Sequence, residues 1–330
     1  MSKRSLATYS IRVRKSGTKD EWLELGNFDG AGGDVLKVCY GYFSALADQH
    51  FDNSFTQQSL GAEPPEVDNR VLKVTLSSGT YGIESTFKDR DSGQDRFKRE
   101  HSDVELISLH NYLVLPSKSK IGLLITERYQ GNGIITTLCK SFNLAFRRRY
   151  PDYTVEINPV SPAAAINQLL IQGRLTKIRL SRHSIPSDLA NAYELSDYEK
   201  DLGTIELVLR PPRSTPLTKK AIQKVLSKNG NAKSLLEFHG VTYDELRAEV
   251  QVGSSLRTLA VTSQSAPSMI YVLEESKGNV SAPPAEVVYS RAAQIVRELA
   301  PDAGILDDFL AEEFVMPDSW HGYRLEVPSP

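Results

Sequence analysis

Hydrophobic and polar positions repeat with two different periods in the first fifty residues, and these periods predict a strand followed by a helix. Residues 8–15 (TYSIRVRK) alternate between apolar and polar positions, which is typical of a strand with one buried face. Residues 34–49 carry apolar side chains at helical spacing, and Asp34 is placed to cap the first turn.

The next forty residues are expected to form a loop and then a hairpin. Residues 52–69 are mostly polar and contain two adjacent prolines, which indicates a loop. The segments 71–77 (VLKVTLS) and 80–88 (TYGIESTFK) both have strand character. The turn-like SSG around Gly79 joins them, so a hairpin is the simplest interpretation.

Residues 121–158 predict a strand, a turn, a helix and a second strand. The apolar run IGLLIT is followed by QGNG, by the helical stretch GIITTLCKSFNLAFRRRY and by TVEIN. If the two strands are parallel neighbours, their connection is expected to be right-handed. One face of the helix carries Ile134, Leu138, Phe142, Ala145 and Phe146, and its last turn carries Arg147, Arg148 and Arg149, where the helix dipole favours cations.

A shorter copy of this pattern follows and leads to a boundary between two lobes. Helices are expected at 163–172 and 188–193, strands at 174–182 and 203–210, and a further helix at 217–228. The proline-rich break between 210 and 216 separates the last strand from that helix. We therefore expect an N-terminal lobe of residues 1–213 and a C-terminal lobe of residues 214–330.

The final third of the chain is also predicted to mix helix and strand. Residues 242–245 (TYDE) match a capping box, and two strands flank the turn VGSS at 252–255. A strand at 269–275, a long helix at 284–299 and an acidic helical tail at 305–314 complete the chain. The fold class is therefore α+β, with mixed sheets and a central strand-helix-strand unit.

Composition places the chain among ordinary globular proteins. Of 330 residues, 40% are hydrophobic and 24% charged, and no apolar run is long enough to span a membrane. No secretion signal is recognisable at the start. The two cysteines, Cys39 and Cys139, are too few for a disulfide framework, so we expect both to be buried and reduced in a cytoplasmic protein with no membrane association.

Charge is distributed unevenly along the chain. Residues 117–233 carry 19 Lys and Arg against 9 Asp and Glu, a net charge of +10. Residues 234–330 carry 6 against 15, a net charge of −9, while residues 1–116 carry 14 against 17. A basic middle is therefore followed by an acidic C-terminal third.

The basic middle predicts a surface for a phosphate backbone if its side chains converge. Tyr129 and Tyr150 lie beside it in the sequence and are candidates for stacking on exposed bases. The alternative is a solvated face that the acidic third neutralises, within one chain or in an oligomer. The candidate nucleic-acid-binding residues are Lys118, Lys120, Arg128, Lys140, Arg147, Arg148, Arg149, Arg174, Lys177, Arg179 and Arg182.

Carboxylates on two predicted strands offer an enzymatic alternative, a metal-dependent nuclease. Asp152 and Glu156 lie at or before the strand TVEIN, and Glu206 lies on GTIELVLR, so the three are candidate catalytic residues if these strand ends are adjacent. No E-x-K pattern follows them. The histidines are scattered without paired ligand spacing, so no metal site is predicted from them.

Arg96 and His101 have the R-x4-H spacing that resembles the catalytic motif of the helical HEPN ribonucleases. In that family the two residues act from one helix. Here they lie in a short polar segment between predicted strands, so a surface role is expected. The glycines of QGNG and of GAGGD at 30–34 lack the spacing of a P-loop or a dinucleotide fingerprint, and no cofactor is predicted.

The stretches KIGLLITERYQGNGIITTLCKSFNLAF and INQLLIQGRLTKIRLSRHSIPSDLA resemble segments of uncharacterised bacterial proteins that accompany mobile elements and phage-defence genes. The resemblance implies a host-defence or mobile-element context and transfers no functional residues. Together with the charge pattern it favours a non-enzymatic component that binds or senses nucleic acid. A metal-dependent nuclease and a protein-interaction subunit, which binds a partner or itself through the acidic third, remain alternatives.

Overall fold

The computed structural model describes residues 4–19, 21–54, 56–129, 133–160, 174–182, 204–210, 237–238, 241–252, 255–262, 268–273, 282–301, 305 and 313–327. These residues form strands and helices, so the chain is a mixed α+β protein as predicted. They divide into two compact units. Unit 1 comprises Met1–Arg4, Tyr9–Ile157 and Glu275–Pro330, and unit 2 comprises Ser5–Thr8 and Asn158–Glu274.

Unit 1 is built on a sheet with the strand order β1-β9-β8-β5-β3-β2, in which β10 also pairs with β1 and β4 also pairs with β5. Its strands are β1 (Arg4–Lys15), β2 (Phe51–Asn53), β3 (Gln58–Ala62), β4 (Glu66–Asp68), β5 (Val71–Thr80), β8 (Glu105–Val114), β9 (Gly122–Tyr129) and β10 (Tyr153–Pro159). Its helices are α1 (Val35–Asp48), α2 (Ile135–Arg149), α8 (Ala285–Leu299) and the short η2 (Asp318–Trp320). The strands β6 (Ser85–Lys88) and β7 (Asp95–Arg99) pair only with each other among the described residues.

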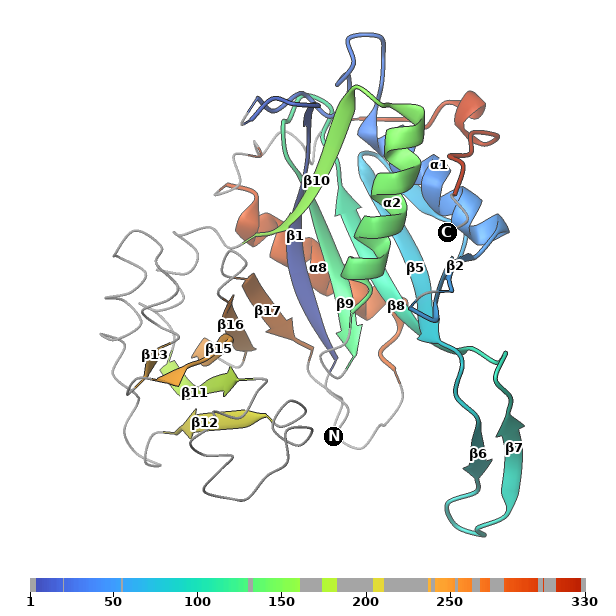
Figure 1. Ribbon diagram of the computed structural model, residues 1–330. Helices are drawn as coiled ribbons and strands as arrows, with labels where there is room; N and C mark the ends of the chain where they lie inside the picture. The colour runs from blue at the N-terminus through green and yellow to red at the C-terminus, as the bar shows by residue number, and fades with distance from the viewer. Residues whose placement is uncertain are drawn as a thin grey trace. The chain divides into compact units, whose positions relative to one another are not determined.

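Helices cover both faces of this sheet: Figure 1 shows α1 and α2 on one face and α8 on the other. The alternation of side chains along β8 explains why both faces are covered. Leu109 and Leu113 are buried in the core beneath α1 and α2. His110 and Tyr112 point to the opposite face, where their rings lie 5.5 and 6.3 Å from the ring of Tyr289 on α8.

The core between the sheet and the first two helices forms as the sequence predicts. All five residues of the predicted apolar face, from Ile134 to Phe146, are buried. The predicted cap of α1 is also confirmed, since the Leu36 N–H donates to the Asp34 carboxylate at 2.8 Å. The two helices are joined by a buried hydrogen bond of 2.9 Å from the Tyr42 hydroxyl to the Ser141 hydroxyl.

A buried arginine connects the start of α1 to the sheet. Arg70 is 2% exposed, and its guanidinium forms two bonds to the Asp34 carboxylate, of 2.6 and 2.9 Å. Its Nε donates to the Leu115 carbonyl at 2.7 Å, and the ring of Phe314 lies 5.1 Å from the guanidinium carbon. Asp34 therefore caps α1 and neutralises Arg70 at the same time.

The predicted turn at SSG is wrong, because β5 runs through it. Ser77, Ser78 and Gly79 pair with Ser108, Ile107 and Leu106 of β8. A Cβ atom at Gly79 would lie 1.8 Å from the Glu105 carbonyl oxygen, so glycine here permits a close approach of two strands rather than a turn. The preference of SSG for turns is overridden by pairing with a strand that is distant in sequence.

One further expectation about this sheet is also corrected, and the condition attached to another is not met. Residues 52–69, expected to form a loop, contain β3, β4 and most of β2, which are too short to show an alternating pattern. The strands that flank α2 are not neighbours, because β1 lies between β9 and β10. The N-terminal strand fills the gap, which no pattern local to residues 121–158 reveals.

Unit 2 contains an antiparallel sheet with the order β12-β11-β15-β16-β17, and Ser5–Ala7 of β1 pair with β17. Its strands are β11 (Arg174–Arg182), β12 (Ile205–Leu209), β15 (Glu245–Val252), β16 (Ser255–Thr262) and β17 (Ser268–Val272), with the separate pair β13 (Glu237–Phe238) and β14 (Val241–Thr242). The hairpin at 252–255 is as predicted. The capping box at 242–245 is wrong, because Leu246, Ala248 and Val250 are buried with the period of a strand.

The division into units differs from the expected lobes 1–213 and 214–330. Residues 158–274 belong to unit 2, while α8 belongs to unit 1 and packs on β8 and β9. Periodicity shows that α8 is amphipathic but not which sheet it covers. The expected boundary near 213, the helices at 163–172, 188–193 and 217–228, and most of the tail at 305–314 lie outside the described residues.

Replacing Arg70 with Met tests the connection between α1 and the sheet. The change leaves the largely buried Asp34 carboxylate without its cation, so we expect the free energy of unfolding to fall by about 3–5 kcal/mol. The matched control is Arg324→Met, which breaks an exposed pair with Asp48 and costs less than about 1 kcal/mol. Urea denaturation followed by circular dichroism measures both, and equal losses in the two variants would contradict this role.

Candidate nucleic-acid interface

The three consecutive arginines of the basic middle are exposed at the C-terminal end of α2. The helix buries Phe142, Ala145 and Phe146 against the sheet and ends at Tyr150, whose backbone N–H donates to the Phe146 carbonyl at 2.8 Å. Arg147, Arg148 and Arg149 follow the last buried residue, and all three are exposed. Their position at the negative end of the helix dipole is favourable for cations.

An aromatic cluster holds this end of the helix in place. The ring of Phe28 lies 5.7 Å from Phe146, 5.0 Å from Tyr150 and 5.4 Å from Tyr153, measured between ring centroids. These contacts pack the loop before α1 against both the end of α2 and the start of β10. The arginines are thus presented from a fixed platform.

The loop between β8 and β9 brings Lys118 and Lys120 to the same end of unit 1. Two backbone hydrogen bonds of 2.8 Å hold this loop: the Leu25 N–H donates to the Ser119 carbonyl, and the Gly26 N–H donates to the Ser117 carbonyl. Gly26 allows this approach, since a Cβ atom there would lie 2.7 Å from that of Ser117. Because Phe28 follows directly, the loop lies beside the platform that carries the arginines.

Two lysines outside the predicted segment belong to the same surface. Lys15, the last residue of β1, and Lys19, in the turn that follows, are both exposed. In the same turn the Ser16 N–H donates to the Asp152 carbonyl at 2.7 Å, just after α2. Sequence analysis missed them because residues 1–116 have no basic excess. We call the following set the basic end: Lys15, Lys19, Lys118, Lys120, Arg147, Arg148 and Arg149.

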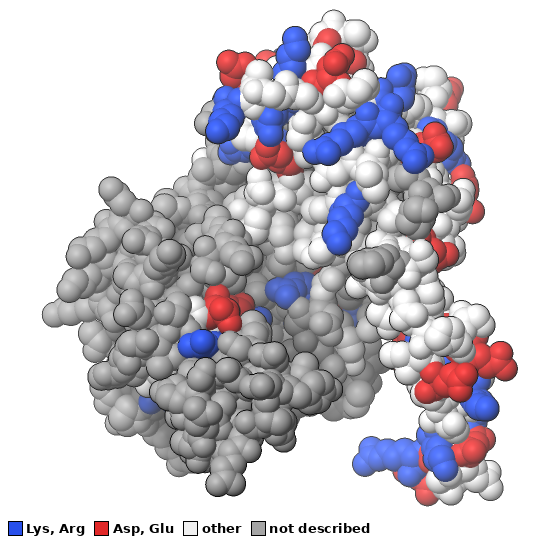
Figure 2. All heavy atoms as spheres, in the orientation of Figure 1, with Lys and Arg blue, Asp and Glu red and all other residues white. Residues whose placement is uncertain are grey.

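Carboxylates lie among these cations but pair with few of them. Figure 2 shows basic side chains gathered around the end of α2 with acidic ones beside them. Among the described residues, one cation of the basic end forms an ion pair: Arg148 lies 3.3 Å from the exposed Glu326 carboxylate. The guanidinium of Arg149 lies 5.3 Å from the ring of Tyr150. Six of the seven cations therefore have no carboxylate partner among the described residues.

Lys140 and Arg128 also lie on unit 1 but are not members of the basic end. Lys140 is exposed on α2 two turns before Arg147, on the same side of the helix. The half-exposed Leu144 lies between them. Arg128 is partly buried on β9. Lys140 thus extends the surface of the basic end, whereas Arg128 is partly removed from solvent.

The remaining predicted cations lie on β11 of unit 2, where carboxylates pair with some of them. Lys177 lies 2.8 Å from Glu249, and Arg179 lies 3.3 Å from Glu206. Arg174 is exposed, and Arg182 is partly buried. The pairs Lys177–Glu249 and Arg148–Glu326 join the basic middle to the acidic third within one chain. Local neutralisation, the alternative for this charge pattern, is thus observed at these two positions.

Two of the candidate nuclease carboxylates are held in ion pairs with different arginines. Glu156 on β10 pairs with Arg14 at 2.7 Å, and Glu206 on β12 pairs with Arg179. Among the described residues β10 pairs with β1 and β12 pairs with β11, so these two strands do not pair with each other. Asp152 is exposed in the turn before β10. Among the described residues, no group of three or more Asp, Glu, His or Cys side chains could hold a metal ion.

Arg96 and His101 lack the helical setting of the ribonuclease motif they resemble. Arg96 lies on β7, where it pairs with Asp89, and His101 is exposed just beyond the strand. Residues five apart on extended chain do not share one helix face. The expected surface role of both residues agrees with this placement.

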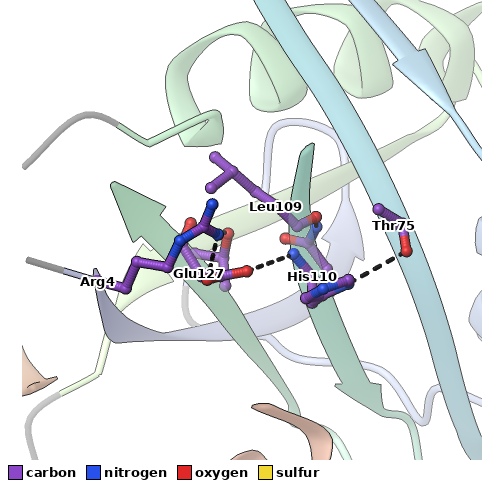
Figure 3. A network of polar contacts seen from close by, with 7 residues as sticks. Arg4, Thr75, Leu109, His110 and Glu127 are labelled. Carbon is purple, nitrogen blue, oxygen red and sulfur yellow. Dashed lines mark hydrogen bonds and ion pairs between the residues drawn. The ribbon is translucent and has the colours of Figure 1, made fainter. Parts of the chain in front are cut away.

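A polar network on the α8 face of the sheet was not anticipated from the sequence (Figure 3). The Glu127 carboxylate is fully buried, lies 2.6 Å from Arg4 Nη1 and accepts a 3.0 Å hydrogen bond from the His110 backbone N–H. The His110 ring nitrogen Nδ1 lies 3.2 Å from the Thr75 hydroxyl. The network fastens the start of β1 to β9, β8 and β5. Glu127 ends an apolar run, but its partner Arg4 is 123 residues away.

Comparisons with known proteins add no family. No protein-family model matches the chain, and no curated protein matches it. No helix that the structure describes is long and apolar enough to cross a membrane.

Both cysteines have raised pKa values because Cys39 is buried and Cys139 is partly buried. Burial raises the pKa of Cys139 from 9.0 to about 11 and also raises that of Cys39. We therefore expect both thiols to resist a disulfide reagent at pH 8 in the folded protein and to react on unfolding. Rapid reaction of either thiol in the native state would contradict this.

The raised pKa of Cys139 also makes the stability of the protein depend on pH, and a titration of stability can check the direction of this dependence. A raised pKa in the folded state gives stability that is complete below pH 9.0 and is lost as pH rises through about 11. We expect Cys139→Ser to lose less stability than the wild-type chain between pH 8 and 10.5. Urea midpoints at the two pH values measure this, and an equal loss in both chains would contradict it.

Proposed function

We propose that the protein binds nucleic acid through the basic end and catalyses no reaction on it. The observation that carries the proposal is the convergence of seven exposed cations from three separate parts of the chain at one end of unit 1. Six of them have no carboxylate partner among the described residues. Such a surface attracts phosphates and releases their counterions on binding.

Contacts with the phosphate backbone, rather than with bases, carry this binding. Tyr150 packs 5.0 Å from Phe28 and 5.3 Å from Phe146, so its ring serves the aromatic platform. Tyr129 lies 5.2 Å from the guanidinium of Arg4. Both tyrosines named as stacking candidates are thus engaged within the protein, and binding through the basic end is expected to be largely independent of sequence.

The context of this activity follows from the resemblance of the central segment. We propose a cytoplasmic protein of a bacterial antiphage-defence or mobile-element system, in which the basic end holds or senses nucleic acid. The acidic C-terminal third would then serve a protein partner wherever it does not neutralise the chain's own cations. The two internal pairs at Glu249 and Glu326 limit that role to its other carboxylates.

Fluorescence anisotropy with labelled single- and double-stranded DNA and RNA tests the proposal. Arg147→Glu/Arg149→Glu is the informative variant, because Arg148 is already paired with Glu326. At low salt we expect its affinity to fall about tenfold or more, and the slope of log K against log salt to decrease by about 2. The matched control, Arg291→Glu/Arg297→Glu, makes the same change in net charge on α8, which covers the opposite face of the sheet from α2, and is expected to retain most of the affinity.

Three other results of the anisotropy titrations would change the proposal in different ways. No binding by the wild-type chain to any of the four nucleic acids would overturn the proposal. An equal loss in both double variants would assign the effect to net charge rather than to the basic end. Loss of labelled substrate only with Mg²⁺ present would overturn the non-catalytic part of the proposal and direct attention to a nuclease.

A further inference from the structure

Strands β6 and β7 form an arm that extends away from the sheet of unit 1 (Figure 1). They pair with each other alone among the described residues and make a two-stranded ribbon. A two-stranded ribbon buries little apolar surface and is only marginally stable by itself. A further strand added to such an arm would bury more of its apolar surface.

Exposed hydrophobic side chains are concentrated on and beside this arm. Five of the ten large hydrophobic residues that are exposed in the described part of the chain lie between positions 83 and 106. Phe87 and Phe97 face each other across the ribbon, 6.1 Å apart between ring centroids, and are 45% and 54% exposed. They line a hollow of about 350 Å³ together with Val104. Such a concentration marks an interaction surface.

The arm is held firmly at its base and at its tip. At the base Arg99, 5% exposed, donates to the Thr80 and Asp103 carbonyls and pairs with Glu105 at 3.2 Å. At the tip the Asp89 carboxylate accepts hydrogen bonds from the Ser92 and Asp91 N–H groups, of 2.7 and 3.0 Å. The ribbon is thus fixed in an extended form before any partner binds.

The two edges of the ribbon differ in their ability to accept another strand. The register shifts between Phe87 and Lys88, which leaves Arg96 as an extra residue on β7. A bulge and a row of charges protect an edge from further pairing, and β7 has both. β6 (STFK) is regular and carries one charge, on Lys88, whose exposed ammonium group also lies 3.2 Å from Asp95 of the same arm. The edge of β6 is therefore the one open to another strand.

We propose that β6 pairs antiparallel with β6 of a second copy of this chain, so that two arms form a four-stranded sheet. In an antiparallel pair, residues that lie opposite each other point to the same face of the sheet. A two-fold axis also keeps equivalent residues of the two copies on the same face, so at the axis a residue must lie opposite its own equivalent. With Thr86 opposite Thr86, the whole of β6 is paired, and Glu84 faces Lys88 of the second copy. Opposite charges at both ends make the strand complementary to itself.

Of the two neighbouring symmetric registers, the one centred on Phe87 is less favourable. With Phe87 opposite Phe87, pairing would extend onto Asp89 and Arg90, where the Asp89 N–H already donates to the Gln94 carbonyl at 2.8 Å within the turn. In the register centred on Thr86, Phe87 lies beside Ser85 of the second copy and diagonal to its Phe87, within reach of an aromatic contact. The exposed rings of both arms are then covered together.

A charge exchange tests the pairing directly by sedimentation velocity over a range of concentrations. We expect the wild-type chain to dimerise, and Glu84→Lys or Lys88→Glu alone to raise the dimer Kd about tenfold by placing like charges opposite each other. Glu84→Lys/Lys88→Glu restores the attraction and the dimer. An equimolar mixture of the two single variants also restores it, because only the heterodimer brings opposite charges together.

Arg90→Glu, at the tip, is the control with the same charge change as Lys88→Glu and leaves the dimer intact. Circular dichroism confirms that each variant is folded, as expected for exposed positions. A wild-type chain that stays monomeric at all concentrations would overturn self-pairing and assign the arm to a different protein. Single variants that dimerise like the wild type, or disruption by Arg90→Glu instead of Lys88→Glu, would overturn the register.

Discussion

The buried ion pair between Arg70 and Asp34 connects four parts of unit 1 that are distant in sequence. Arg70 lies at the turn before β5, and Asp34 caps α1. Leu115 follows β8, and Phe314 covers the guanidinium from the C-terminal segment. Because a buried guanidinium is tolerated only when its donors are satisfied, the contacts of Arg70 favour this arrangement of the four segments. That arrangement also sets where the loop after β8 emerges, and this loop carries Lys118 and Lys120.

The basic end depends on this frame, although none of its cations is buried. Its residues lie in loops and at a helix end, where a rigid scaffold presents side chains to a ligand. Phe28 connects the frame to the surface, since the loop that contains it leads into Asp34 and its ring packs on Phe146 and Tyr150. Packing in the core thus determines the spacing of the exposed charges, while the charges themselves contribute little to stability.

The arm and the basic end show two ways in which charged residues are used. At the basic end cations gather with few carboxylate partners, which favours binding to a polyanion. On the arm acids and bases are paired closely, as in Lys88–Asp95 and Arg96–Asp89, so no net field develops and the exposed phenylalanines dominate. The first pattern favours nucleic acid and the second favours a protein surface.

By itself the sequence determined the local elements with strong periodicity: β1, α1 with its Asp34 cap, and α2 with its buried face and terminal arginines. These follow from interactions between residues close in the chain. It also indicated Lys118, Lys120 and the three arginines as one candidate set. The tertiary structure alone decided that β5 runs through SSG, that β1 lies between β9 and β10, and that Lys15 and Lys19 join the basic end. Each depends on partners tens of residues away or more, and strand pairing and buried ion pairs leave no periodic trace in the sequence.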